Sequence, residues 1–175
     1  VRSVLTHKRR EGKYIGTFAL YGYIKDPADN NHLLVDPEAA EVVRRIFTLY
    51  LSGNGATRIA RILNEEGIPS PTQYKREDLW GKATIYRMLT NQTYTGNLEQ
   101  GRHKKVSYKS KKTVWLPKKD WIIVPGTHEG IIDSESFARV QQMLREHARG
   151  GGQGKVNPLA GKVFCGNCGS AMEQT

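Results

Sequence analysis

The sequence predicts an α+β protein in which short helices are followed by a small β-sheet and one further helix. Three observations predict this arrangement. Between residues 36 and 92, apolar side chains recur at the spacing of one helix face. After Asn91 the pattern changes to alternating apolar and polar residues, which is typical of strands. Helical spacing returns after Asp133. A length of 175 residues allows one domain or two small ones.

The N-terminal region predicts the end of a helix, an extended loop and one short strand. Residues 1–13 carry five basic residues and one acidic residue, and Gly12 is a suitable stop for a helix that arrives from upstream. Residues 16–24 are rich in Tyr, Phe and Gly, which favours an extended loop. Residues 33–35 are apolar and form a candidate strand.

Three helices are predicted within residues 36–92, which would form a helical subdomain. They start after Asp36 and near residues 56 and 82, and they end near Gly53, Glu66 and Thr90. Asp36 can cap the first helix, and Pro37 suits its first turn. Gly67 is a good C-cap for the second helix. Residues 68–80 contain two prolines, so a loop should separate the second helix from the third.

The following segment, residues 93–148, predicts strands around a basic run and then a helix. The predicted strands are residues 94–98 and 121–124. Between them, residues 102–119 carry eight Lys or Arg residues and no acid. Asp133 can cap a helix that continues to about His147. Residues 149–157 are Gly-rich and predict a flexible linker, after which residues 158–175 would begin another module.

Composition favours nucleic acid as the partner and excludes a membrane span. Lys and Arg outnumber Asp and Glu 27 to 17, which gives a formal charge of +10 and a pI near 9.7. No apolar run approaches the ~18 residues that a transmembrane helix needs, and no signal peptide is recognisable. With only two cysteines, a reducing compartment is expected. Both ends look cut, so we expect a fragment of a longer protein.

The second and third predicted helices suggest a helix-turn-helix. In that motif the second helix lies in the major groove, where polar side chains on its outer face reach base edges. Here four polar residues alternate with apolar ones on the third helix: Lys82, Thr84, Tyr86 and Arg87. Two ordinary core helices with solvated outer faces would show the same pattern. The connection is also far longer than the usual turn of 3–4 residues, so both interpretations stay open.

The basic run of residues 102–119 favours phosphate contacts. A stretch of like charge repels itself unless something neutralises it, and phosphates would do so with release of counterions. Tyr108 and Trp115 are interleaved with the lysines and would suit sugar or base contacts. The alternative is a hairpin tip that lysines merely keep soluble.

Two further groups of residues could bind a metal ion or take part in a reaction. Cys165 and Cys168 have the spacing of half a zinc site, which needs two more ligands that this sequence does not supply. A thioredoxin-like redox pair is the alternative, but the upstream pattern is not the βαβ unit that it would need. His128 and Glu129 could form an acid/base pair, although a structural histidine is the better interpretation because no nucleophile or metal motif accompanies them.

Several short motifs recur in a fixed order: Tyr21-Gly22-Tyr23, Pro37-Glu38-Ala39, Val43-x-x-Ile46-Phe47-x-x-Tyr50, Ile59-Ala60-x-x-Leu63-Asn64-x-x-Gly67-Ile68-Pro69, Trp80-x-x-x-Thr84-Ile85-x-x-Met88-Leu89-x-Asn91-x-x-Tyr94-x-Gly96, His128-x-x-Ile131-Ile132-Asp133-x-x-x-Phe137-x-x-Val140-Gln141 and Cys165-x-x-Cys168-Gly169-x-x-Met172. Each motif alone is weak. In this order and spacing the set resembles the DNA-binding half of the large serine recombinases, the family of phage integrases and transposon resolvases. The resemblance covers nearly the whole chain.

The resemblance implies a mostly helical recombinase domain over residues 1–148, with a helix-turn-helix-like helix pair and a small β-hairpin or sheet. Residues 1–13 would end a linker helix that lies along the DNA, and residues 158–175 would begin a truncated zinc ribbon. Such enzymes cut DNA with a serine in a catalytic domain that would precede Val1. We therefore assign no catalytic residue here and expect the chain alone to be inactive, although the parent protein would be a site-specific DNA recombinase.

We predict sequence-specific binding of duplex DNA at recombination attachment sites. Self-association as a dimer or tetramer on DNA and bound zinc are expected of the full-length protein, with no zinc in this chain alone. We also expect a cytoplasmic location, at the bacterial nucleoid, for a protein that could be encoded by a phage or another mobile element. A stand-alone transcription regulator and an RNA-binding module remain as alternatives. The predicted DNA contacts are Arg9, Arg10, Lys13, Arg58, Lys82, Thr84, Tyr86, Arg87, Asn91, Gln92, Arg102, Lys104, Lys105, Lys109, Lys111 and Lys112.

Overall fold

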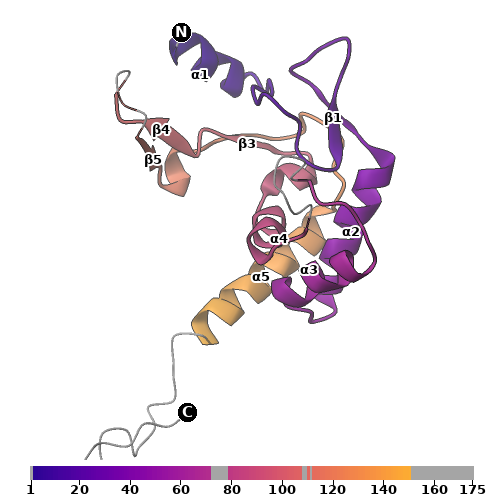
Figure 1. Cartoon of the computed structure of the whole chain (residues 1–175). Coiled ribbons are helices and arrows are strands. Elements are labelled where there is room, and N and C mark those ends of the chain that lie inside the picture. Colours follow the sequence, from indigo (N-terminus) through magenta and orange to yellow (C-terminus); the bar gives the residue numbers. More distant parts are fainter. Residues whose placement is uncertain (1, 72–78, 108–109, 111, 151–175) are drawn as a thin grey trace, which may run out of the picture. The chain divides into compact units, whose positions relative to one another are not determined.

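The computed structural model describes residues 2–71, 79–107, 110 and 112–150. Figure 1 shows helices together with short strands, which confirms the predicted α+β class. The helices are α1 (Arg2–Arg10), α2 (Pro37–Leu51), α3 (Ala56–Glu65), α4 (Lys82–Leu89) and α5 (Ser134–Gly150), with 3-10 turns η1 (Gln92–Thr95) and η2 (Lys118–Asp120). The strands are β1 (Tyr23–Lys25), β2 (Leu33–Val35), β3 (Leu98–Gln100), β4 (His103–Lys105), β5 (Thr113–Trp115) and β6 (Ile122–Val124).

The described strands pair into three antiparallel sheets of two strands each: β1 with β2, β3 with β6, and β4 with β5. The chain divides into one compact unit of residues Val1–Gln141 and a second unit that begins at Gln142. Within the described part of the second unit, α5 continues to Gly150. The predicted Gly-rich linker therefore starts inside a helix, and its remaining residues lie outside the described residues.

Capping residues determine where several helices begin and end. The carboxylate of Asp36 accepts a hydrogen bond from the Ala39 amide at 3.4 Å and caps α2, as predicted. Gly12 adopts a φ of +74°, and the Lys13 amide returns to the Lys8 carbonyl at 3.0 Å, which closes α1 as a glycine C-cap does. Gly55 precedes α3 in an extended conformation and caps it with no side-chain hydrogen bond.

The core of the first unit lies between α2, α3, α4 and the beginning of α5. Each helix turns one apolar stripe inward, as the helical spacing of the sequence predicted. The most deeply buried side chains of these helices are Val43, Ile46, Phe47, Ile59, Leu63, Ile85, Leu89 and Val140. Burial of each large apolar side chain contributes about 1.5 to 3 kcal/mol, so these contacts dominate the stability of the helical part.

The strand predicted at residues 94–98 is wrong over most of its length. Residues Gln92–Thr95 form η1, and β3 begins only at Leu98. The side chain of Asn91 caps η1 by accepting from the Thr93 amide at 3.2 Å. Gly96 then takes a φ of +84°, and a Cβ there would lie 2.8 Å from the carbonyl oxygen of His128. The Asn91 cap begins the turn and the left-handed Gly96 ends it, and neither is visible as a periodic pattern.

Tyr94 connects this turn to two other parts of the chain. Its hydroxyl donates to the Tyr21 carbonyl at 3.0 Å. Its own carbonyl accepts from the amides of Ile131 and Ile132, at 2.9 and 3.0 Å. The ring is 1% exposed, and burial raises the pKa of its hydroxyl well above the ordinary value. The segment between α4 and β3 is therefore a fixed anchor inside the protein.

Candidate nucleic-acid interface

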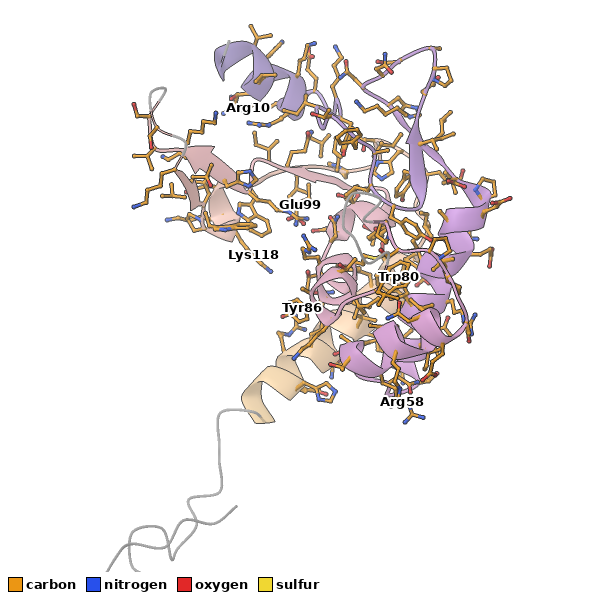
Figure 2. The ribbon with its side chains drawn as sticks, viewed as in Figure 1. Arg10, Arg58, Trp80, Tyr86, Glu99 and Lys118 are labelled. Carbon is orange, nitrogen blue, oxygen red and sulfur yellow. The ribbon has the colours of Figure 1, made fainter. Side chains whose placement is uncertain are left out.

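Helix α4 has one buried side and one polar side, as the sequence predicted. Ile85, Met88 and Leu89 are buried. Lys82, Tyr86 and Arg87 are exposed, and Thr84 is partly exposed. Figure 2 shows Tyr86 projecting from α4, whereas Trp80 lies within the packed helices. Arg87 lies back along its own helix, with Nε 3.2 Å from the Ala83 carbonyl and Nη2 3.4 Å from Thr84 Oγ1. A ligand with stronger acceptors, such as phosphate or guanine, could displace these two hydrogen bonds.

A pair of hydrogen bonds holds the residue that leads into α4. Trp80 donates its backbone N–H to Asn64 Oδ1 at 2.7 Å, and its carbonyl accepts from Asn64 Nδ2 at 3.0 Å. The indole N–H donates to the Ile68 carbonyl at 2.9 Å, and the ring packs edge-on against Tyr21. Trp80 is 3% exposed. Helices α3 and α4 pack on one another with their connection fixed at both described ends, and residues 72–78 lie outside the description.

The C-terminal end of α4 is tied to the β part through Arg102. Its Nη2 donates to Asn91 Oδ1 at 2.7 Å, and its Nε lies 2.7 Å from Glu99 Oε1. The Nε–H is not aligned with that carboxylate oxygen, so the contact is an ion pair without a directed hydrogen bond. The guanidinium also lies over the ring of Trp121 at 5.5 Å. The side chain of Glu99 is only 4% exposed, so Arg102 compensates a buried charge.

These contacts change the interpretation of two residues that were predicted to bind DNA. Asn91 is 7% exposed, and its amide oxygen is shared between the cap of η1 and Arg102. Arg102 is engaged by a carboxylate, an amide and an indole ring. Both side chains have a structural role in this conformation, because the amide oxygen of Asn91 and the Nη2 and Nε atoms of Arg102 contact other residues of the fold. Gln92, the neighbour of Asn91, is partly exposed and remains available from η1.

The remaining predicted DNA contacts, in the helical part and at the N-terminus, differ in their exposure and in their ion-pair partners. Arg58 is exposed on α3 (Figure 2) and has no ion-pair partner among the described residues. Arg10 is likewise exposed at the end of α1. Lys13 Nζ lies 3.1 Å from Glu11, an exposed pair that contributes little energy. Arg9 is partly buried, and its Nε is enclosed without a hydrogen-bond partner in the described part of the chain.

The basic run of residues 102–119 forms the predicted hairpin. Strands β4 and β5 pair with His103 opposite Trp115, Lys104 opposite Val114, and Lys105 opposite Thr113. All six strand residues are exposed, and Lys112 near the turn is exposed as well. Lys109 and Lys111 lie outside the described residues. The structure therefore brings Lys104, Lys105 and Lys112 to one exposed hairpin, as a phosphate contact would require.

Two lysines of the basic run that were not among the individually predicted DNA contacts lie beside this hairpin. Lys118 and Lys119 lie in η2 and are exposed. Lys118 Nζ is 5.8 Å from the ring centre of Trp121, the same ring that Arg102 covers. A cation over an aromatic face is a common arrangement. This contact with Trp121 was not predicted, although the adjacent Lys-Lys-Asp-Trp sequence could have indicated it.

His128 is a structural residue, as the sequence analysis preferred. Its Nε2 lies 2.8 Å from the Thr93 carbonyl, so this nitrogen carries the proton, and Nδ1 accepts from Thr127 Oγ1 at 2.7 Å. The ring packs edge-on against Tyr23 at 5.0 Å. Burial lowers the pKa of His128, although the hydrogen bond to Thr93 opposes that shift. Both ring nitrogens serve the fold, so no acid/base role is assigned.

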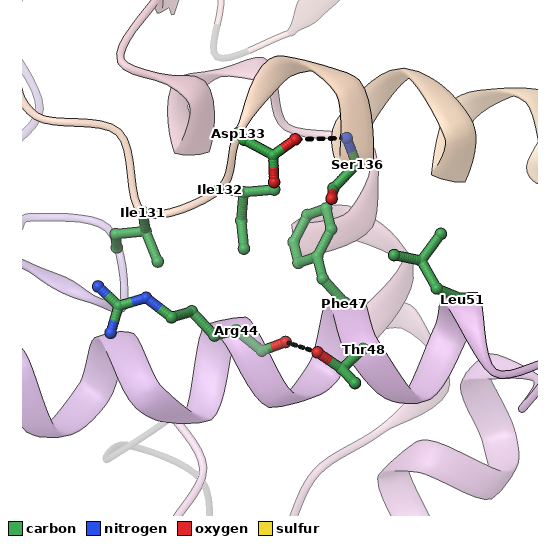
Figure 3. A pocket seen from close by; sticks show the side chains of 8 residues that line it. All are labelled: Arg44, Phe47, Thr48, Leu51, Ile131, Ile132, Asp133 and Ser136. Carbon is green, nitrogen blue, oxygen red and sulfur yellow. Dashed lines mark hydrogen bonds between the residues drawn. The ribbon is translucent and has the colours of Figure 1, made fainter.

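A hollow of about 220 Å³ lies between α2 and the start of α5, and Figure 3 shows it from close by. Its lining is Arg44, Phe47, Thr48, Leu51, Ile131, Ile132, Asp133 and Ser136. The polar groups there already serve the helices. Asp133 accepts from the Ser136 amide at 2.7 Å and caps α5, which lowers the pKa of its carboxyl. Thr48 donates to the Arg44 carbonyl at 3.0 Å. We assign no ligand to this hollow.

The described residues contain no group of His, Cys, Asp and Glu that could hold a metal ion. Cys165 and Cys168 lie outside them, so the half zinc site stays a prediction. Among the same residues, no helix has the length and apolar character that crossing a membrane requires.

The Recombinase family model matches residues 37–147, from the start of α2 into α5. The uncharacterized protein YefB of Bacillus subtilis (strain 168) is 33% identical over 111 residues, which are 61% of this chain and 37% of that protein. A solved structure described as "Sequence Requirements of the Listeria innocua prophage attP site" is 25% identical, with a TM-score of 0.55 over 97% of this chain and 63% of its own. Another solved structure, "Crystal Structure of a LSR-DNA Complex", is 24% identical, with a TM-score of 0.56. The match covers 97% of this chain and 48% of that chain.

This chain spans only 37% of YefB and less than two thirds of either solved chain. The second solved structure supports the fold alone. The family model, in contrast, covers more than half of the 175 residues and includes the helices that form the core and the hairpin that carries the lysines. The resemblance that the motifs suggested is thereby confirmed at the level of the family. The chain belongs to the Recombinase family.

Proposed function

We propose that this chain binds duplex DNA at recombination attachment sites, as the non-catalytic part of a site-specific serine recombinase. The observation that carries the proposal is α4. It presents Lys82, Tyr86 and Arg87 on a helix whose opposite side is buried and whose two ends are fixed by side-chain hydrogen bonds. A helix held in this way can enter the major groove without losing its orientation. The likeness to a structure concerned with a prophage attP site supports the choice of DNA.

The two groups of polar side chains would have different tasks. Exposed lysines on β4 and near its turn would contact phosphates, which position the protein without reading sequence. Side chains of α4 and Gln92 would contact base edges and specify the site. Arg87 suits that task because a guanidinium can donate two hydrogen bonds to one guanine. Asn91 and Arg102 would act indirectly, by fixing η1 and the end of α4.

Selection of bound duplexes from a random pool, at defined salt, tests the proposal. A recovered consensus that competes for binding against scrambled duplexes would support sequence-specific binding. Recovery of unrelated sequences with equal affinity would contradict it. The pool needs no knowledge of the natural site, and the length of the consensus would also report how much of the chain contacts DNA.

Two other functions would be separated by further observations. A stand-alone transcription regulator would also select a duplex, so the gene decides between them: a serine-recombinase catalytic domain encoded upstream of Val1 supports the recombinase. An RNA-binding module would prefer structured RNA to the selected duplex in a competition at equal salt. Self-association on DNA is proposed for the full-length protein, and a mobility ladder on DNA with two half-sites would test it.

A further inference from the structure

The β4–β5 hairpin differs from the other sheets because none of the described residues covers either of its faces. Strand β1 buries Tyr23 and β3 buries Leu98, whereas all six residues of β4 and β5 are exposed. A two-stranded hairpin without a covered face is marginally stable in water. A partner that covers one face would therefore stabilise the hairpin as well as bind it.

The pairing register gives the two faces different chemistry. Opposite residues point to the same side, and sides alternate along a strand. His103, Lys105, Thr113 and Trp115 therefore share one side, which we call the aromatic face. Lys104 and Val114 lie on the other side. The aromatic face combines two rings, a hydroxyl and a cation, all of which are exposed.

Trp115 is the most exposed large apolar side chain that the structure describes, at 72%. Its described ring neighbour is His103, edge-on at 5.5 Å. The other two tryptophans are used inside the protein, since Trp80 is buried and Trp121 lies beneath Arg102 and Lys118. A tryptophan that the described residues leave so exposed indicates a contact with another molecule.

Charge identifies what that molecule would be. Residues 102–119 contain eight Lys or Arg residues and no acid, in a chain of formal charge +10. A second copy of so basic a surface would be repelled, and a polyanion would be attracted. Among polyanions, duplex DNA has a groove wide enough to admit a two-stranded β-ribbon. A ribbon in that groove places its cations near phosphates and an aromatic ring near sugar and base edges.

We propose that the aromatic face of the β4–β5 hairpin is a second duplex contact, in addition to α4, in which Trp115 packs against sugar and base edges within a groove. Lys105 stands near a phosphate, Thr113 offers a hydroxyl, and His103 supports the indole from the side. The inference rests on the proposed function, because it requires that the chain binds duplex DNA. It adds a contact through apolar burial, which salt screens far less than the lysine contacts.

The test measures how accessible Trp115 is to acrylamide, with and without DNA. A fluorophore-labelled mixed-sequence duplex of about 30 base pairs, roughly three helical turns, is titrated at low salt, and its anisotropy reports binding. Tryptophan fluorescence quenching is then measured on the free and the saturated protein. The difference between the unmodified chain and Trp115→Phe isolates the contribution of Trp115. Far-UV circular dichroism shows that each variant retains its fold.

We expect Trp115 to be readily quenched in the free protein and severalfold less quenched in the saturated complex. Trp115→Ala should bind the duplex about tenfold more weakly than the unmodified chain. Trp115→Phe keeps an aromatic ring and should have an affinity between these two. Val114→Ala, one residue away on the opposite face, is the matched control and should bind within about twofold of the unmodified chain, because it leaves the aromatic face intact.

Different failures have different meanings. Duplex binding with Trp115 equally quenched, and with Trp115→Ala binding as tightly as the unmodified chain, overturns the aromatic-face contact and leaves DNA binding in place. Protection of Trp115 by poly-glutamate to the same extent as by duplex also overturns it, because negative charge alone would then suffice. If the unmodified chain binds no duplex at low salt, the proposed function fails and this inference fails with it.

Discussion

Asn91 and Arg102 are joined by a hydrogen bond of 2.7 Å that connects the end of α4 to the start of the basic hairpin. The same guanidinium compensates the buried carboxylate of Glu99. Two residues that sequence alone assigned to DNA are therefore the link between the two surfaces proposed to contact it. Their effect on binding would pass through the fold.

Replacement of Arg102 tests that link. Arg102→Ala leaves the Glu99 carboxylate buried without a charge partner, and breaking a buried pair costs about 3 to 5 kcal/mol. Arg102 is partly exposed, so we expect a loss of about 2 to 3 kcal/mol in the free energy of unfolding, measured by urea denaturation. The double variant Arg102→Ala, Glu99→Gln should regain part of the loss. A single variant as stable as the unmodified chain would contradict the structural role.

The two hydrogen bonds between Asn64 and the backbone of Trp80, which we call the Asn64–Trp80 clamp, should contribute a similar amount to the free energy of unfolding. Asn64→Ala leaves the backbone N–H and carbonyl of Trp80 unpaired at a buried position, and each orphaned group costs about 1 to 3 kcal/mol. We expect a loss of about 2 kcal/mol or more in urea denaturation. Asn54→Ala is a suitable control, because Asn54 makes a single side-chain hydrogen bond, to the Leu49 carbonyl. Equal losses in the two variants would argue against the clamp.

Base reading by α4 predicts that Arg87→Ala weakens binding to the selected duplex. A lost bidentate contact to a base is worth about 1 to 3 kcal/mol, which corresponds to roughly tenfold or more in affinity. Gel-shift titration provides the measurement. Arg61→Ala removes the same charge from α3, where Arg61 pairs with Glu65 at 3.5 Å, and should have a much smaller effect. If the two variants bind alike, Arg87 contributes only charge.

The hairpin lysines predict a change in salt dependence. Replacement of Lys104, Lys105 and Lys112 by Gln should weaken binding to any duplex. It should also flatten the slope of log affinity against log salt by up to about 0.9 for each lysine that contacts a phosphate. The matched variant replaces Arg44, Arg45 and Arg61, each of which pairs with a glutamate, and removes the same charge. A slope equal to that of the unmodified chain would show that the hairpin lysines only interact with solvent.

Burial of His128 predicts loss of stability in acid. Because the pKa of the folded state lies below the ordinary value of 6.5, the unfolded chain binds more protons in this window. The free energy of unfolding should be highest above about pH 6.5 and should fall as the pH drops below it. His128→Gln should show a flatter pH dependence of urea midpoints over that window, whereas replacement of the exposed His147 should preserve it. A His128→Gln profile parallel to that of the unmodified chain would contradict this assignment.

Much of the helical fold could be predicted because its determinants are local. The Asp36 cap, the stop at Gly12 and the apolar stripes of α2 to α4 depend on residues within a few positions of one another. The turn at η1 could not be predicted, because it depends on Tyr94 contacting Tyr21 and Ile131, which are distant in sequence. Long-range packing there overrides the alternating pattern that suggested a strand.

The exposed basic side chains were also predictable, but their pairing was not. Composition indicated that the basic run would be charged and exposed, and β4 shows it to be so. Composition could not show that Arg102 would turn inward toward Glu99, although Glu99 is only three residues away, because it does not indicate that the Glu99 carboxylate is buried. The same limit applied to Trp115, whose exposure follows from the absence of a covering element among the described residues.

Helix α4 is the element proposed to read the sequence of duplex DNA. The most direct test compares affinities for the selected duplex and a scrambled duplex at near-physiological salt, for the unmodified chain and for Lys82→Ala, Arg87→Ala. We expect at least about a hundredfold preference of the unmodified chain for the selected duplex. The α4 variant should lose most of this preference while it still binds scrambled DNA. Equal affinity of the unmodified chain for both duplexes would contradict the claim.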